Sequence, residues 1–292
     1  MSLDGLVKVL LLAVVQGIAE FLPVSSSGHL VVLDSLYHRV FGTGDVDLEN
    51  VILTVTLHVG TLAAILVVYR RDLMEIWCKP RLCVSIVLAT IPAAALGILF
   101  KSQIEATFKK PLVVACGWVV TAGLLRYGQR FGRDARLLDE LTYRDALVIG
   151  GFQAVSALFR GVSRSGSTIA GGLFCGLRRD AAASFSFLIA IPVTAGAALV
   201  KGAPLIKLLF VRLGVLPAAS GPSSQKIADM LGGYSPLVLL IGATTSFVVG
   251  LVSLRWLLRV ITVRGLNGFA YYCLAAAALT FAWQGYEYLI AN

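Results

Sequence analysis

Long apolar runs separated by short polar segments are the main pattern of this chain. A helix that crosses a membrane needs about 20 consecutive, mostly apolar residues. Six runs are close to that length, and they lie at 50–69, 83–100, 111–127, 183–200, 236–256 and 266–290. Because each run is long enough to cross the hydrocarbon core as a helix, the pattern predicts an all-α, polytopic membrane protein with about six spanning helices.

Two further apolar regions, 5–33 and 145–177, are each interrupted near the middle by a polar cluster. The interruptions fall at 23–28 and 160–166. Each flanking arm has about 10–17 residues and would extend about 15–25 Å as a helix, short of a hydrocarbon core of about 30 Å. We therefore expect two re-entrant helical hairpins. Irregular backbone at membrane depth is tolerated only inside protein or beside a wet cavity, so both turns are predicted to line a polar site within the bundle.

Composition agrees with a membrane environment. Hydrophobic residues make up 58% of the 292 residues and charged residues only 14%, whereas soluble domains have about 25% charged residues. The five cysteines are odd in number and lack C-x-x-C spacing, so we expect buried free thiols rather than a disulfide framework. The first apolar run leads directly into Glu20, so it is predicted to belong to the folded protein rather than to a cleavable signal.

The positive charge of the chain is explained by membrane topology. The net charge is +9, but the basic residues lie between apolar runs, so no nucleic-acid partner is expected. One set of linkers carries twelve basic residues and lies at 70–81, 126–144 and 255–264. The alternate set carries eight and lies at 34–49, 101–110 and 201–235. The positive-inside rule makes the first set cytoplasmic. Both termini are then external, the first hairpin enters from outside, and the second enters from the cytoplasm.

The two halves of the chain share one order of elements, a broken hairpin followed by three spans. The stretch from Gln16 to Gly28 ends in Ser-Ser-Ser-Gly, and the stretch from Gln153 to Gly166 ends in Ser-Arg-Ser-Gly. Three spans per half give the halves opposite orientations. The sequence therefore predicts an inverted-topology repeat within a single integral membrane domain, 1–292, with halves at about 1–127 and 145–290 and a site at their interface.

The first polar cluster contains a candidate metal site. Gln16 and Glu20 are four residues apart, so they share one face of a helix. A carboxylate can bind a divalent cation through oxygen, with an amide as a neutral second ligand. The alternative is a carboxylate that is simply solvated near the headgroups. Because burying an ionisable group is costly, we favour function and predict Glu20 and Gln16 as ligands of Mg²⁺ or Ca²⁺.

Three serines and a histidine follow this pair. Ser25, Ser26 and Ser27 precede the second arm of the hairpin, and the amino end of a helix binds phosphate readily. A serine in this place can also be a helix cap. His29 titrates near neutrality, so it can pass a proton or attack phosphorus, although a lone histidine is usually a satisfied polar residue.

The second polar cluster, Ser163-Arg164-Ser165-Gly166-Ser167-Thr168, is predicted to be an anion cradle. Arg164 offers a planar fork that suits phosphate oxygens, with snorkelling to the interface as the alternative. Hydroxyls and free amides around it would complete the cradle. The predicted substrate-binding residues are Ser25, Ser27, Ser163, Ser165, Gly166 and Thr168. Arg160 adds a charge whose role the sequence leaves open.

One pair of polar residues lies inside a predicted span rather than in a hairpin. His58 and Thr54 are one helical turn apart. They can line the cavity, but hydrogen bonding between helices is the favoured interpretation for such residues in a spanning helix.

The quoted motifs together resemble one family. Gln16-x-x-x-Glu20 followed by Phe-Leu-Pro-Val-Ser-Ser-Ser-Gly-His29, with Gly161-Val-Ser-Arg-Ser-Gly-Ser-Thr168 in the second half, resembles the undecaprenyl pyrophosphate phosphatase family of bacteria, the BacA type. The likeness covers nearly the whole chain. Two departures stand out: Gln16 is the amide variant of a Glu/Gln position, and Arg160 replaces the usual proline.

The resemblance implies an enzyme of the bacterial inner membrane. It implies hydrolysis of undecaprenyl pyrophosphate to the monophosphate and inorganic phosphate, which recycles the carrier lipid of peptidoglycan synthesis and gives bacitracin resistance. The expected substrate is a polyprenyl pyrophosphate lipid, and the active site is expected to open to the external side. The oligomeric state, including a homodimer, is left open.

The predicted catalytic residues are Glu20, Ser26, His29 and Arg164. Ser26 is the candidate nucleophile with His29 as general base or acid; His29 as the nucleophile, or an activated water, are the alternatives. The rival function is a transporter or flippase of polyprenyl phosphate, because carriers also use inverted repeats and broken helices. A carrier needs anion binding but not a hydroxyl, a histidine and a metal carboxylate together, so the motif content favours the phosphatase.

Overall fold

The structure, a computed structural model, describes residues 3–41, 51–100, 110–133, 135–212 and 234–291. In this part of the chain the secondary structure is helical, and the only β pairing is an isolated bridge between Arg136 and Leu177. The helices are α1 Leu3–Ala19, α2 Ser26–Phe41, α3 Val51–Val68, α4 Arg70–Glu75, α5 Pro80–Leu99, α7 Pro111–Phe131, α8 Tyr143–Leu158, α9 Arg164–Phe174, α10 Arg179–Arg212, α12 Pro236–Arg264 and α13 Asn267–Ala291, with short 3₁₀ turns at Ile76–Cys78 and Leu138–Glu140. The all-α prediction is confirmed.

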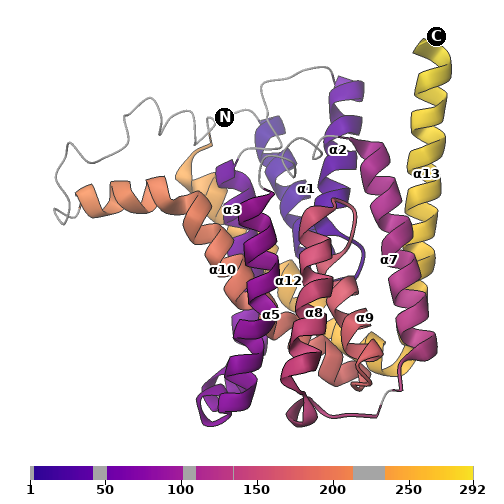
Figure 1. Ribbon diagram of the computed structural model, residues 1–292. Coiled ribbons are helices and arrows are strands. Elements are labelled where there is room, and N and C mark those ends of the chain that lie inside the picture. The colour runs from indigo at the N-terminus through magenta and orange to yellow at the C-terminus, as the bar shows by residue number, and fades with distance from the viewer. Residues whose placement is uncertain (1–2, 42–50, 101–109, 134, 213–233, 292) are drawn as a thin grey trace.

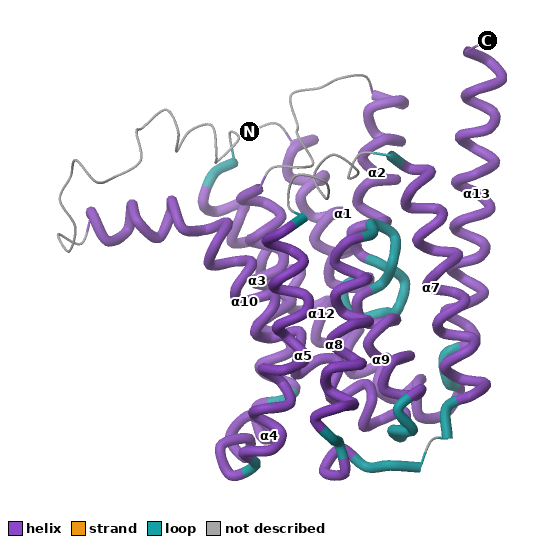
Figure 2. Tube along the Cα trace, viewed as in Figure 1, coloured by secondary structure: helices purple, strands orange, loops and turns teal. Residues whose placement is uncertain are grey.

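Both interrupted regions form helical hairpins, and the hairpins are opposed. Figure 1 shows α1 and α2 descending from the end of the bundle where α13 finishes, and α8 and α9 rising from the opposite end. Their turns meet at mid-depth (Figures 1 and 2), where the Ser165 hydroxyl donates to the Leu22 carbonyl over 3.2 Å. Neither hairpin crosses the bundle, as the short arms predict.

Four of the described helices are long and apolar enough to be candidate membrane spans. They are Pro80–Leu99, Pro111–Phe131, Arg179–Ala203 and Pro236–Arg264, and shorter apolar helices lie at Leu6–Ala19 and Ile52–Val68. Helices α3 and α13 run between the same two ends of the bundle in Figure 1. The chain is thus a multi-pass membrane protein. Helix α10 exceeds the predicted 183–200, because it starts at Arg179, continues to Arg212 and bends away from the bundle near its end.

The two halves pack into one another. The first arm of each hairpin lies on a spanning helix of the other half, α1 on α12 and α8 on α5, and the pairs α3–α10 and α7–α13 also join the halves. Small residues permit this close contact. A Cβ on Gly150 would lie 2.7 Å from the Ala89 carbonyl oxygen, and one on Gly60 would lie 2.4 Å from that of Ala243. These contacts are those expected of an inverted repeat; the boundaries of the halves stay a prediction.

The outer surface is apolar, as a lipid-facing surface must be. Large hydrophobic side chains such as Ile98, Val200 and Val263 are at least 75% exposed, while Phe21, Phe185 and Phe187 are fully buried between the helices. The five cysteines are free, but only Cys273 is buried. The prediction of buried thiols is therefore wrong for most of them, because an apolar position in this protein can face lipid as well as the core.

Candidate active site

The first hairpin turn is shaped by a serine in an unusual backbone conformation. Helix α1 ends at Ala19, and α2 begins at Ser26. Ser25 has φ of 67°, in the left-handed region that residues other than glycine rarely adopt and that is often retained at functional sites. Its hydroxyl accepts the Gly28 N–H over 3.3 Å, which caps α2. The turn therefore directs Ser26 back toward the end of α1.

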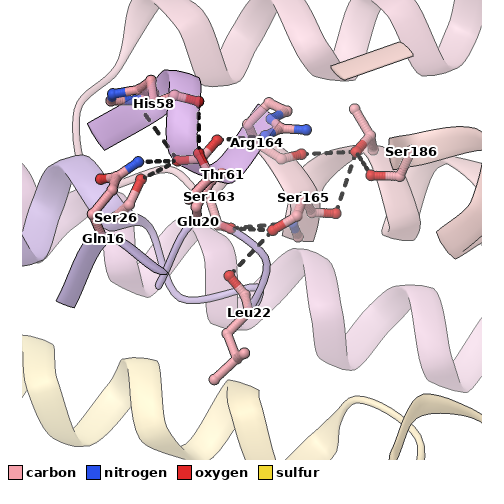
Figure 3. A network of polar contacts seen from close by, with 12 residues as sticks. Gln16, Glu20, Leu22, Ser26, His58, Thr61, Ser163, Arg164, Ser165 and Ser186 are labelled. Carbon is pink, nitrogen blue, oxygen red and sulfur yellow. Dashed lines mark hydrogen bonds and ion pairs between the residues drawn. The ribbon is translucent and has the colours of Figure 1, made fainter. Parts of the chain in front are cut away.

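Glu20 is the centre of the site. Its Oε2 accepts hydrogen bonds from Gln16 Nε2 over 3.0 Å and from the Ser26 hydroxyl over 2.8 Å. Its Oε1 accepts from Arg164 Nη2 over 2.6 Å, so residues 144 positions apart in the sequence meet here. Figure 3 shows these side chains converging on the carboxylate. The Glu20 side chain is only 9% exposed, and a buried charge of this kind is tolerated because it is paired and hydrogen-bonded.

The second turn presents Arg164 in a similar way. Gly161 has φ of 87°, and a Cβ there would lie 2.2 Å from the Val114 carbonyl oxygen, so only glycine fits. Ser163 caps α9, since its hydroxyl accepts the Gly166 N–H over 3.1 Å. The Ser163 N–H donates to the Thr121 hydroxyl over 2.9 Å. Helix α7 thus fixes the turn, and Arg164, the first residue of α9, reaches Glu20.

Thr168 lies one turn into α9 and supports Arg164 from behind. Its hydroxyl is 2.8 Å from the Arg164 carbonyl oxygen and 2.6 Å from the hydroxyl of Ser186 in α10. Ser165 contacts the Ser163 hydroxyl at 3.2 Å and bonds the first turn through Leu22. Ser27 lies 3.4 Å from the Ser25 hydroxyl. In this arrangement the predicted substrate-binding hydroxyls of the second turn hold the turn together, and the Gly166 amide is engaged by the cap.

His29 is placed away from the carboxylate. Its Nδ1 is 2.7 Å from the Ser25 carbonyl oxygen and its Nε2 is 2.7 Å from the Tyr272 hydroxyl. Because a carbonyl oxygen only accepts, Nδ1 of the neutral ring carries the proton and Nε2 accepts from Tyr272. The ring also packs edge-on against Trp118, with 5.1 Å between centroids. Both ring nitrogens are thus engaged outside the Glu20 cluster, and a role of His29 in proton transfer stays a prediction.

Two buried polar atoms beside Glu20 have no hydrogen-bond partner among the described residues. They are Nη1 of Arg164, a donor, and Oε1 of Gln16, an acceptor. Buried polar atoms in native proteins are nearly always satisfied. An unpaired donor on the guanidinium suits a phosphate oxygen, and an unpaired amide oxygen suits a cation. The two atoms therefore leave Arg164 with a donor for an anion and Gln16 with an amide oxygen for a cation.

The donor set fits a weakly held divalent cation. No group of three or more His, Cys, Asp or Glu side chains capable of holding a metal is present in the described part of the chain. Mg²⁺, however, is commonly bound by one or two carboxylates, substrate phosphates and water rather than by an all-protein cage. Glu20 and the free oxygen of Gln16 meet that requirement. The cation itself stays a prediction.

A cleft with an apolar wall leads to this cluster. It lies between α1, α2 and α3 and is lined by Leu12, Gln16, Leu30, Leu53, Thr54, Leu57 and His58. Gln16, Thr54 and His58 form its polar part. Gln16 and His58 contact the Glu20 carboxylate, His58 through Nε2 at 3.7 Å. The sequence assigned His58 to helix packing in preference to the cavity. Its position opposite Glu20 depends on the register of α1 against α3, which has no signal in the sequence.

Comparisons with known proteins agree with the geometry. A family profile described as "Bacitracin resistance protein BacA" matches residues 9–279. A protein of Rhodopirellula baltica named undecaprenyl-diphosphatase is 38% identical over 278 residues, which cover 95% of this chain and 97% of that protein. Proteins of the same name from Mycobacterium leprae and Idiomarina loihiensis are each 36% identical, covering 91% and 93% of this chain and 89% and 96% of theirs.

Proposed function

Because the chain belongs to the family of bacitracin resistance protein BacA, we propose that it is an undecaprenyl-diphosphatase. It hydrolyses undecaprenyl pyrophosphate to undecaprenyl phosphate and inorganic phosphate, which recycles the carrier lipid for peptidoglycan synthesis and gives bacitracin resistance. The observation that carries this proposal is the meeting of a carboxylate, a hydroxyl and a guanidinium, Glu20, Ser26 and Arg164, at mid-depth in the bundle.

Ser26 is placed to be the nucleophile, with Glu20 as its base. The Ser26 hydroxyl already donates to Glu20 Oε2 over 2.8 Å, within the reach that proton transfer requires. In the proposed step Ser26 Oγ attacks the terminal phosphorus and its proton passes to Glu20. The bond from phosphorus to the bridging oxygen breaks, and undecaprenyl phosphate leaves. Water then hydrolyses the phosphoserine and releases inorganic phosphate.

Arg164 is placed to stabilise the charge that develops on the phosphate. Its Nη1 is buried and unpaired within the described structure, and its Nη2 is held by Glu20. A fork of two parallel N–H groups suits phosphate oxygens. The amino end of α2, which begins at Ser26, adds the partial positive charge of its free amides. In phosphoryl transfer most of the catalytic effect comes from positioning and electrostatic stabilisation of this kind.

The cation and the lipid chain have distinct places in this proposal. Glu20 and Gln16 would hold Mg²⁺ or Ca²⁺, which would neutralise charge on the pyrophosphate. A carboxylate has about four lone-pair directions, so Glu20 can accept from Ser26 and bind a cation together. The cleft beside Leu12, Leu30, Leu53 and Leu57 has a volume of only about 10 Å³, about the room that one water needs, so the isoprenoid chain would lie outside it, toward the surrounding lipid. His29 would act as a positioning residue that holds the Ser25 carbonyl and hence the turn.

The site is expected to face the external side of the bacterial inner membrane. The cleft lies between the first hairpin and α3. This hairpin enters from the end of the bundle at which both ends of the described chain lie. The charge difference between the linkers, twelve basic residues against eight, supports an external position for that end. A carrier function would also suit two opposed hairpins, but the related proteins are named for hydrolysis, not transport.

The test is phosphate release by the purified chain in liposomes that contain undecaprenyl pyrophosphate, with and without EDTA. We expect steady release that EDTA abolishes, and a matched Glu20→Gln preparation should release phosphate more slowly by about 10³-fold or more. Release at the background level from the intact chain would contradict the proposal. Movement of the lipid between leaflets without phosphate release would favour the carrier instead, and full activity in EDTA would remove the cation from the mechanism.

A further inference from the structure

His58 has the geometry of a metal ligand although no motif marks it. It lies in α3, and its Nδ1 is 2.8 Å from the Thr54 carbonyl oxygen. Because a carbonyl oxygen can only accept, Nδ1 of the neutral imidazole carries the proton, which leaves the lone pair on Nε2. That nitrogen lies 3.7 Å from Glu20 Oε2. With the ring neutral, Nε2 and Oε2 are two electron-pair donors that face each other across a gap too long for a hydrogen bond; with the ring protonated, the same two atoms form an ion pair.

A cation between these two atoms would account for the arrangement. A histidine that binds a metal almost always donates its other ring N–H to a backbone carbonyl, a carboxylate or water, as His58 does to Thr54. Two ligands at about 2.1 Å from one ion, separated by about 90–120°, are about 3.0–3.6 Å apart. The separation of 3.7 Å between His58 Nε2 and Glu20 Oε2 lies just above this range, so a small approach of the two side chains would bring both onto one ion.

Gln16 supplies an independent second indication. Its Oε1 is buried and has no hydrogen-bond partner among the described residues, while its Nε2 donates to the same Oε2 of Glu20. The terminal torsion of a glutamine side chain is broad and roughly two-fold, so a half-turn presents the oxygen instead of the nitrogen. Gln16 and His58 line the same cleft. Arg164 bonds the other carboxylate oxygen, Oε1, so its positive charge lies on the opposite side of Glu20.

We propose that His58 Nε2 is a third ligand of the divalent-cation site formed by Glu20 and Gln16. The proposal rests on the cation of the proposed function and adds a nitrogen to a set that was so far all oxygen. An imidazole ligand suits first-row transition metals better than Ca²⁺ or Mg²⁺, which prefer oxygen ligands. The site should therefore bind Mn²⁺ more tightly than Ca²⁺, and the difference should depend on His58.

Mn²⁺ is the metal used in the test, because its electron paramagnetic resonance signal shows which nuclei are bound to it. The chain contains three histidines, His29, His38 and His58, so single replacements can assign a nitrogen ligand. Metal-free purified protein in detergent would be titrated with Mn²⁺. Binding would be followed by the electron paramagnetic resonance signal of the free ion, and ligand nitrogen by pulsed measurements of the bound ion. The variants are His58→Gln and, as matched controls, His29→Gln and His38→Gln.

We expect the intact protein to show one directly bound imidazole nitrogen. His58→Gln should lose this coupling and weaken Mn²⁺ binding about 10-fold or more, with a smaller change for Ca²⁺, whereas both control variants should keep the coupling. If His58→Gln fails to fold, the double variant His29→Gln/His38→Gln leaves His58 as the sole histidine, and the coupling must persist in it. Absence of nitrogen coupling in the intact protein, or its survival in folded His58→Gln, would overturn the proposal.

Phosphate release from undecaprenyl pyrophosphate, measured on the same preparations, separates this inference from the proposed function. Hydrolysis without a bound imidazole nitrogen would reject His58 as a ligand and leave the phosphatase intact. A bound imidazole nitrogen without hydrolysis would reject the phosphatase and leave the metal site.

Discussion

The two hairpin turns have the same architecture but different chemistry. Ser25 and Ser163 each cap the second helix of their hairpin by accepting the N–H three residues later. The next residue, Ser26 in the first turn and Arg164 in the second, bonds Glu20 in each case. The two opposed hairpins thus bring two equivalent positions to one carboxylate from opposite ends of the bundle. One turn supplies the hydroxyl and the other supplies the cationic side chain.

The glutamines that precede the turns show how the two hairpins differ. Gln16 and Gln153 are both buried, and each has an amide oxygen without a partner among the described residues. Gln16 Nε2 donates to Glu20, whereas Gln153 Nε2 donates to the Ala89 carbonyl over 3.1 Å. Four residues after Gln153 the chain has Ala157 in place of a carboxylate. The second turn therefore packs its glutamine against α5, and only the first turn carries the carboxylate around which the site forms.

The largest fall in phosphate release is expected when Glu20 is replaced, because this carboxylate has no counterpart before the second turn. Glu20→Gln removes the base of Ser26 and the partner of Arg164, so phosphate release should fall by about 10³-fold or more. Gln16→Glu is the matched control. It adds a charged oxygen ligand, so it should keep activity and tighten binding of the cation. Steady-state release by each variant, with folding checked by size-exclusion profile, decides the point. Near wild-type release by folded Glu20→Gln would refute the role of the carboxylate.

A loss nearly as large is expected when the hydroxyl of the first turn is removed. Ser26→Ala takes away the proposed nucleophile and should reduce kcat by about 10³-fold. Ser27→Ala is the neighbouring control. Among the described residues the Ser27 hydroxyl has a hydrogen bond only with the Ser25 hydroxyl, so the defect of this variant should be much smaller. If Ser26→Ala keeps a tenth or more of the activity, the serine only positions the substrate, and a water or His29 is the nucleophile.

Replacing Arg164, the equivalent residue of the second turn, should lower kcat by an intermediate factor. Arg164→Lys keeps the charge but loses the two parallel N–H groups that match phosphate oxygens. Because this fork stabilises charge that develops in the transition state, we expect a fall of about 10–10³-fold in kcat with a smaller change in KM. A rise in KM at constant kcat would instead mean that Arg164 contributes only to substrate attraction.

The smallest losses of activity should follow replacement of the capping serines, which both turns have. Ser25→Ala and Ser163→Ala each remove a helix cap, which costs about 1 kcal/mol. Both variants should unfold at a lower temperature and retain partial activity. Thermal unfolding in detergent, followed by circular dichroism, measures this loss. A complete loss of activity in a stably folded Ser163→Ala would show that the hydroxyl contacts substrate rather than only capping α9.

The hairpins could be predicted from the sequence because the length of an apolar arm is a local property. The predicted regions 5–33 and 145–177 contain both observed turns. The end of α10 could not be predicted in this way, because hydropathy marks where the hydrocarbon ends and not where a helix stops, and α10 continues to Arg212.

The members of the site were predicted, but their pairing was not. The inverted repeat predicts that the two turns meet, and the structure confirms it with the Glu20–Arg164 ion pair. Which side chains pair depends on the register between helices, which the motifs do not encode. His29 follows the serine-rich turn in sequence, yet its ring is held between Ser25, Trp118 and Tyr272. His58 carries no motif and faces Glu20.

The central claim is that the two opposed turns form one catalytic unit, and a double-mutant cycle on Glu20→Gln and Arg164→Lys tests it most directly. Residues that act as a unit show strongly non-additive losses. We predict that the double variant releases phosphate at a rate within a few-fold of Glu20→Gln alone. If the two losses multiply instead, so that the double variant falls below Glu20→Gln by the full Arg164→Lys factor, the turns act independently and the account is contradicted.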